Sequence, residues 1–288
     1  MKISFHTDAF NTSFKSFDHA LNFASKNTIK YIECGVIEGA CWIQGLGYFP
    51  HISLLDDPIM MKEKMQALGI EFSQIDAAYP LSNPEAPYVA VPYILNAMRW
   101  AKLVGCKRIA TTDGLDKPDS MDEKEAMAHM KRQYLEILRY AEKYEIFINI
   151  EVHGYFTTNP EMLEEMLAFS DSPYLGLNLD TGNSFIAGRD PVAFAKQFIK
   201  RINHVHIKDV SEELAAALRG EDTGIALSQS SAGEGVNAGN IVEILKLLKA
   251  DGYNGHLSLE CDGFGGSGLL KSVNWLRARL AELGIKEG

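Results

Sequence analysis

Histidine, lysine and acidic side chains follow short apolar runs in this sequence, and such side chains bind divalent cations or transfer protons. In "INHVHIKDV", residues 202–210, every second position carries one of them: His204, His206 and Lys208. Three other apolar runs end in a carboxylate: Glu151, Asp180 and Glu260. Three carboxylates and one imidazole form an oxygen-rich set, which favours one Mn²⁺ ion, with Mg²⁺, Co²⁺ and Zn²⁺ as alternatives. The other interpretation is that each side chain separately caps a strand end or forms a salt bridge.

Eight short apolar runs alternate with amphipathic segments along the chain. The runs cover residues 2–7, 31–36, 71–79, 108–114, 146–154, 174–183, 204–210 and 256–263. Strands that are regularly separated by helices predict a parallel sheet with right-handed crossovers, and eight such units in 288 residues predict a (β/α)₈ TIM barrel. We expect a single α/β domain over residues 1–288, with helices that begin at Asn159-Pro160 and Asp190-Pro191.

A barrel of this kind would bring the four candidate ligands together. Chemistry in (β/α)₈ barrels lies at the carboxyl ends of the strands, so Glu151, Asp180, His206 and Glu260 should meet at one rim. An open, doubly wound sheet is the structural alternative. It usually has a glycine-rich turn after its first strand when it binds a dinucleotide, whereas "FHTDAFNTSF" follows here, so no nicotinamide cofactor is expected.

The composition limits the partners and the compartment. With 46% hydrophobic and 23% charged residues the chain is an ordinary globular protein, and its net charge of −10 disfavours nucleic acid and anionic membranes as partners. The four cysteines form no CxxC pair, which favours free thiols. The amino-terminal residues lack the apolar core of a signal peptide, and no run is long enough to cross a bilayer. We therefore expect a cytoplasmic protein.

Several short motifs carry a family resemblance, strongest between residues 146 and 262. "EVHG", "LDTGN", "HVHIKD", "AGEGVN" and "SLE" occur in the order seen in the xylose isomerase-like barrel superfamily. The chain most resembles its sugar phosphate isomerase/epimerase branch, which also contains endonuclease IV relatives. The resemblance implies a divalent metal held by Glu151, Asp180, His206 and Glu260, and chemistry on a ketose or related sugar. It also implies that the second histidine of the H-x-H pair is the ligand, so His204 should pack or hydrogen-bond beneath it.

Two reactions are compatible with this resemblance. In the epimerases, two glutamates exchange a proton beside a carbonyl that the metal polarises, and Glu151 and Glu260 match them. The expected function is therefore a metal-dependent sugar isomerase or epimerase. However, Asn183 stands where epimerases of the group often have a histidine, and His153 follows Glu151 by two residues. If His153 is the base, the alternative is a lyase or dehydratase that acts on a 3-keto sugar, keto-glycoside or inosose.

The remaining candidates concern substrate and partners. We expect four side chains to contact a small sugar substrate: His6, Asn183, Lys208 and Arg219. Lys208 alternatively forms a salt bridge to Glu151 or Asp209, and His6, Glu33 and Gln74 alternatively make structural hydrogen bonds. The amides of "AGEGVN" could surround an anion, and the aromatic loop with Trp42, Tyr48 and Phe49 suggests a homodimer or homotetramer. An endonuclease IV-like nuclease would need three zinc ions and a basic surface, and a non-catalytic scaffold would not need the ligands, so neither is favoured.

Overall fold

The strands of the protein form a closed parallel barrel. The structure is a computed structural model, and it describes residues 1–13, 15–38, 52–220, 230–261 and 265–288. The eight barrel strands are β1 (Lys2–His6), β2 (Tyr31–Ile37), β4 (Glu71–Pro80), β5 (Arg108–Thr112), β6 (Phe147–Glu151), β7 (Leu175–Asp180), β8 (Ile202–Ile207) and β9 (His256–Leu259). Each pairs in parallel with the next, and β1 pairs with both β2 and β9, which closes the barrel. A short strand, β3 (Ile52–Ser53), pairs with β2 alone. The predicted (β/α)₈ barrel is thus confirmed.

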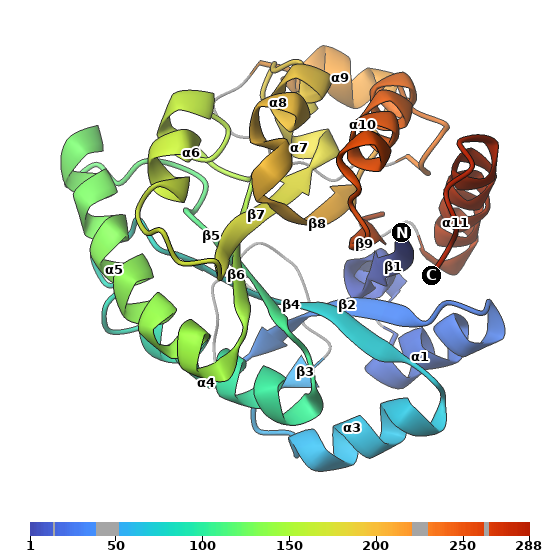
Figure 1. Ribbon diagram of the computed structural model, residues 1–288, viewed down its shortest axis with the longest axis horizontal. Helices are drawn as coiled ribbons and strands as arrows, with labels where there is room; N and C mark the ends of the chain where they lie inside the picture. The colour runs from blue at the N-terminus through green and yellow to red at the C-terminus, as the bar shows by residue number, and fades with distance from the viewer. Residues whose placement is uncertain (14, 39–51, 221–229, 262–264) are drawn as a thin grey trace.

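Helices surround the strands on the outside (Figure 1). They are α1 (Phe17–Lys26), α3 (Pro58–Ala67), α4 (Ala90–Val104), α5 (Glu123–Tyr144), α6 (Pro160–Leu167), α7 (Thr181–Ile186), α8 (Pro191–Phe198), α9 (Glu212–Leu218), α10 (Ala238–Asp251) and α11 (Gly265–Glu282), with 3₁₀ turns η1 (Thr7–Ser13) and η2 (Ile199–Arg201). Asn159 and Asp190 cap α6 and α8 with their side-chain oxygens, and a proline follows each cap, as the sequence predicts.

The apolar core lies between the strands and the helices, and the alternation along each strand decides which side chains enter it. Val205 and Ile207 of β8 are fully buried in this core, while His204 and His206 alternate with them. Successive side chains of a strand point to opposite faces, so the two histidines face the barrel interior. The spacing of "HVHI" therefore follows from a strand that packs helices on one side and polar groups on the other.

The two ends of the described chain lie together, beside α11 and β1 (Figure 1). The Gly288 amide donates to the Met1 carbonyl at 2.9 Å. Cys34, Cys106 and Cys261 are buried and form no disulfide among the described residues, as the sequence predicts, whereas Cys41 and the aromatic loop lie outside the described residues. Among the helices of the described part, none has the length and apolar character needed to span a membrane.

Candidate metal centre

Four of the side chains singled out by the sequence meet at the carboxyl ends of the strands. Glu151 ends β6, Asp180 ends β7, His206 lies on β8 and Glu260 directly follows β9. Their ligand atoms all lie within 4.8 Å of one another. His206 Nδ1 is 3.1 Å from Glu151 Oε1, 3.6 Å from Glu260 Oε2 and 3.8 Å from Asp180 Oδ2. The barrel thus brings the predicted ligand set to one point.

Asp180 is the clearest sign that this cluster suits a cation. Its Oδ1 caps α7 by accepting from the amides of Gly182 and Asn183 at 2.7 and 2.8 Å. Its Oδ2 is buried, with no N–H or O–H donor among the described residues, and lies 3.8 Å from His206 Nδ1. Burial and the neighbouring Glu260 raise the pKa of Asp180. A buried carboxylate oxygen without a donor, beside the ligand atoms of Glu151, His206 and Glu260, fits a divalent ion.

Beneath the four ligands lies a second set of polar side chains inside the barrel, which we call the lower layer. Its members are fully buried: Glu33, Gln74, Asn149, Asn178 and His204. Glu33 Oε1 is 3.0 Å from His206 Nε2, and Glu33 Oε2 is 2.8 Å from His204 Nε2. His204 thus hydrogen-bonds to Glu33 beneath the candidate ligand His206, as expected. Barrel interiors are usually filled by branched apolar side chains, so this polar layer is a specific feature of the chain.

Lys208 is buried beside the candidate ligands and forms an ion pair with one of them. Its Nζ lies 3.1 Å from Glu260 Oε2, a partner that the sequence did not indicate. The lysine stem runs over Gly182, where a Cβ atom would lie 2.6 Å from Lys208 Cγ. Glycine at this position therefore makes room for the lysine.

His153 lies next to the cluster, just beyond the end of β6. The strand ends at Glu151, so strand alternation does not set the position of His153. Its Nδ1 is 2.8 Å from Thr112 Oγ1 at the end of β5, and its backbone amide donates to Thr157 Oγ1 at 2.8 Å. Burial lowers the pKa of His153, while the nearby Glu151 raises it. The imidazole is thus held beside the candidate ligands, in surroundings that lower its pKa.

The other expected substrate contacts lie at different distances from the ligands. The His6 ring is 6.1 Å from that of His206, so it borders the cluster. Asn183 Nδ2 donates to the Val152 carbonyl at 3.1 Å and thereby fixes the chain after Glu151. Arg219 is exposed, and its guanidinium lies 3.9 Å from the Phe185 ring, outside the ligand set.

Asp76 is a residue of this centre that sequence reasoning missed. It is 8% exposed, and its Oδ2 lies 3.9 Å from His6 Nε2. Burial, followed by the charge of Glu151, raises the pKa of Asp76 to about 7. The available signal was its place two residues after Gln74 on β4, which puts both side chains on the inner face.

The glycine-flanked "AGEGVN" segment does surround an anion, and that anion is the protein's own Asp209. Asp209 Oδ2 accepts from the amides of Gly233 and Gly235 at 2.8 and 3.0 Å, and Oδ1 accepts from Asn237 at 3.0 Å. A Cβ at Gly235 would lie 2.5 Å from Asp209 Oδ1. The amides that could have surrounded an external anion are therefore occupied by the carboxylate next to Lys208.

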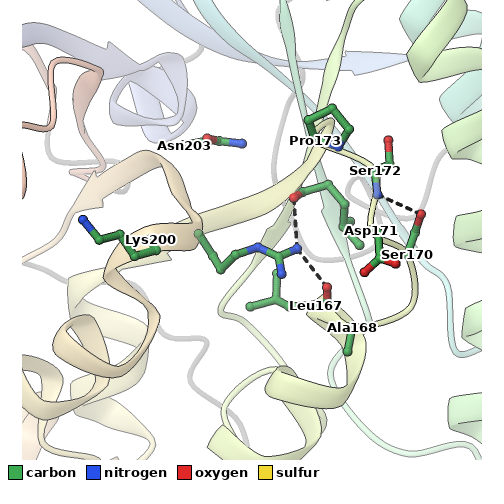
Figure 2. Close-up of a pocket in the computed structure, with 10 residues that line it drawn as sticks. Leu167, Ala168, Ser170, Asp171, Ser172, Pro173, Lys200 and Asn203 are labelled. Atoms are coloured by element: carbon green, nitrogen blue, oxygen red, sulfur yellow. Dashed lines mark hydrogen bonds between the residues drawn. The ribbon is translucent and has the colours of Figure 1, made fainter.

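A separate pocket lies at the opposite end of the barrel, at the amino ends of β7 and β8 (Figure 2). Asp171, Ser172, Lys200 and Asn203 are among the residues that line it. Arg201 crosses it and donates to the Leu167 and Leu175 carbonyls at 2.8 and 3.2 Å. These contacts join α6 to β7, so we assign this end a structural role. In (β/α)₈ barrels the amino ends of the strands usually contribute to stability, and the carboxyl ends carry the active site.

A parallel (β/α)₈ barrel with a buried carboxylate–histidine cluster at the carboxyl ends of its strands defines the class of this protein. The family model of the xylose isomerase-like TIM barrel matches residues 42–279 of this chain. The chain belongs to this family.

Individual relatives cover the chain to different extents. Inosose dehydratase of Clostridium botulinum (strain Eklund 17B / Type B) is 27% identical over 112 residues, and the match spans only 35% of either chain. Among solved structures, a D-tagatose 3-epimerase-like protein has a TM-score of 0.78 at 21% identity and covers 99% of this chain and 98% of its own. The IOLI protein with a bound zinc atom has a TM-score of 0.77 at 16% identity, with 98% and 99% covered. The probable 3-DHS dehydratase AsbF of Bacillus anthracis has a TM-score of 0.71 at 20% identity, with 96% and 99% covered. At these identities the structural relatives show the fold.

Proposed function

We propose that the protein is a divalent-metal-dependent lyase that eliminates water from a cyclic keto-polyol, such as an inosose or a 3-keto sugar. The observation that carries this proposal is the ion pair between Lys208 Nζ and Glu260 Oε2 at 3.1 Å. Epimerisation needs two groups that exchange a proton on opposite faces of one carbon, and Glu260 would be one of them. A buried ammonium group at this distance favours the carboxylate anion and makes Glu260 a weak proton acceptor.

Elimination needs only one base, and His153 is well placed for it. The imidazole stands beside Glu151, and Thr112 Oγ1 holds its Nδ1 at 2.8 Å, so the ring keeps one orientation. In the proposed step, the proton beside the ketone passes to His153 and the electron pair of the C–H bond forms a C=C bond. The C–O bond on the next carbon breaks, and the departing hydroxide takes up the proton that His153 received and leaves as water.

The four ligands supply the rest of the proposed centre. Glu151, Asp180, His206 and Glu260 would hold one divalent ion, which as a Lewis acid makes the proton beside a ketone more acidic. The oxygen-rich set supports our prediction of Mn²⁺, and the zinc in the IOLI relative keeps Zn²⁺ as an alternative. His6 and Asp76 border the ligands and are proposed contacts for substrate hydroxyl groups. The inosose dehydratase and 3-DHS dehydratase relatives support an elimination.

The second candidate is the sugar isomerase or epimerase that the sequence favours. Glu151 ends β6 and Glu260 follows β9, and these two strands flank the pair β7 and β8. Both carboxylates nevertheless approach His206 Nδ1, at 3.1 and 3.6 Å, which supports this candidate. Two carboxylates that converge in this way could act on the two faces of one carbon. The D-tagatose 3-epimerase-like structure is in line with this candidate.

Proton NMR in D₂O distinguishes the two reactions. The metal-loaded protein is incubated with a panel of inososes, 3-keto sugars and ketoses. We expect the proton next to the ketone to disappear while a vinylic proton of the unsaturated product appears. Formation of an epimer without a vinylic signal would favour the second candidate, and a panel without any exchange would contradict both.

Replacement of His153 tests its role as the base. We expect His153→Gln to keep one metal ion per chain while turnover in the same assay falls by roughly 10²–10⁴-fold, the usual contribution of a general base. His129→Gln is a matched control, because His129 is a buried histidine of α5 whose Nε2 lies 2.9 Å from the Asn83 carbonyl. Near-normal turnover in metal-loaded His153→Gln would return the base role to the glutamate pair.

A further inference from the structure

We propose that Glu33 is a positioning residue for the metal centre: it holds the proton of His206 on Nε2 and so directs the Nδ1 lone pair to the cation. The inference rests on the metal centre proposed above and adds a residue that the reaction does not otherwise use. Glu33 lies within β2, and its carboxylate is fully buried. Its Oε1 lies 3.0 Å from His206 Nε2, while His206 Nδ1 faces Glu151 at 3.1 Å.

The lower layer fixes the direction of each hydrogen bond around Glu33. Asn149 Nδ2 donates to Gln74 Oε1 at 2.7 Å, so the Gln74 amide presents its NH₂ group to Glu33 Oε1, at 2.8 Å. An ionised carboxylate only accepts hydrogen bonds, so the His206 Nε2 that faces the same oxygen carries a proton. His206 Nδ1 is then the nitrogen that offers a lone pair to a metal.

His204 completes this arrangement, which accounts for the second histidine of the H-x-H pair. Its Nε2 lies 2.8 Å from Glu33 Oε2, so both oxygens of the carboxylate are engaged and the group is held against rotation. A carboxylate taken out of water is costly unless hydrogen bonds compensate it, and three donors do so here. A carboxylate behind a ligating histidine fixes the ring and makes it a stronger ligand.

Metal affinity provides the first test. We expect Glu33→Gln, which keeps the shape but removes the charge, to bind Zn²⁺ about 10–100-fold more weakly in competition with a chelator. Ser73→Ala is the control, because it removes a buried hydrogen bond to Ser4 of 2.6 Å, on the same strand as Gln74, without touching His206. Its affinity should equal that of the wild type, and circular dichroism of both apo-proteins checks folding.

The second test uses the wild-type protein alone and so does not depend on whether a variant folds. In the Zn²⁺-loaded protein labelled with ¹⁵N-histidine, long-range ¹H–¹⁵N correlation should show His206 protonated at Nε2 and metal-bound through Nδ1. A proton on Nδ1, or a Glu33→Gln affinity within twofold of the wild type, would overturn the positioning role while leaving the metal centre intact. A wild-type protein that binds no Zn²⁺, Mn²⁺, Co²⁺ or Mg²⁺ would overturn the metal centre and this inference together.

Discussion

Asp180 divides its two carboxylate oxygens between two tasks. Oδ1 caps α7, whereas Oδ2 faces His206 and Glu260 without a donor among the described residues. Asp180→Asn can keep the capping oxygen while it replaces the second oxygen by an NH₂ group, which does not ligate a metal. The capping role and the ligand role can therefore be separated by one substitution.

We expect Asp180→Asn to lose its metal ion while the apo-protein melts no lower than apo wild type. The stability should be kept because the cap remains and one of three neighbouring carboxyl groups is removed. Metal analysis by mass spectrometry and thermal melts in a chelator measure the two effects. Retention of one ion per chain in Asp180→Asn would contradict the proposed ligand set.

The ligand residues could be predicted individually, but their supporting contacts could not. Glu151, Asp180 and Glu260 end apolar runs, and the barrel itself brings such ends together. Glu33 instead meets a histidine 173 positions away, which no local pattern reveals. Asp76 was missed because β4 continues to Pro80, so this carboxylate does not mark the end of an apolar run. The sequence did not show that Lys208 pairs with Glu260, because only the side-chain geometry distinguishes this carboxylate from those of Glu151 and Asp209.

Asp209 holds the two ends of the connection from β8 to α10, which also contains α9. The amides of Gly233, Gly235 and Asn237 all donate to this carboxylate, which is buried. We expect Asp209→Ala to lower the free energy of unfolding by about 3 kcal/mol or more, because several buried amides lose a charged acceptor. Urea denaturation measures this loss.

A neighbouring acidic residue supplies the control for this prediction. Glu234 lies in the same segment but is half-exposed and pairs with Lys271 at 2.9 Å. Surface ion pairs contribute little, so Glu234→Gln should leave the unfolding midpoint nearly unchanged. Equal midpoints for Asp209→Ala and Glu234→Gln would show that Asp209 does not hold the connection.

The strands and helix caps were more predictable than the ends of the strands. Each predicted apolar run overlaps a barrel strand, and both predicted Asx-Pro caps are present. The run 146–154 was expected to continue past Glu151, but Thr157 Oγ1 accepts from the amides of His153 and Gly154 and turns the chain there. The side chain of Asp113 in turn accepts from Thr157, at 2.9 Å. Asp113 follows β5 and so belongs to the preceding βα unit, which is why no local sequence pattern reveals its contact to Thr157.

Self-association remains a prediction that the exposed apolar side chains support. Leu55, Ile59 and Met60 are 84%, 50% and 71% exposed and follow the aromatic loop in the chain. Neighbouring exposed apolar side chains are typical of an interface, and two-fold symmetry is the commonest arrangement. We expect light scattering at micromolar concentration to give a multiple of the 31.9 kDa chain mass, and Leu55→Glu with Met60→Glu to reduce it. A wild-type mass of one chain would contradict the dimer or tetramer.

The contacts of Asp209 affect how the segment between Val210 and Gly233 could be changed in length in the proposed enzyme. The Asp209 carboxylate accepts hydrogen bonds from the amides of Val210 and Gly233. Both ends of the intervening segment are therefore fixed to one side chain. The entropy of closing a flexible loop changes slowly with its length, by about 0.6 kcal/mol for each doubling. A stretch of different length could therefore be inserted between these anchors, and the proposed metal ligands beneath would keep their places. The proposed enzyme could in this way be refitted for another substrate by exchanging one segment.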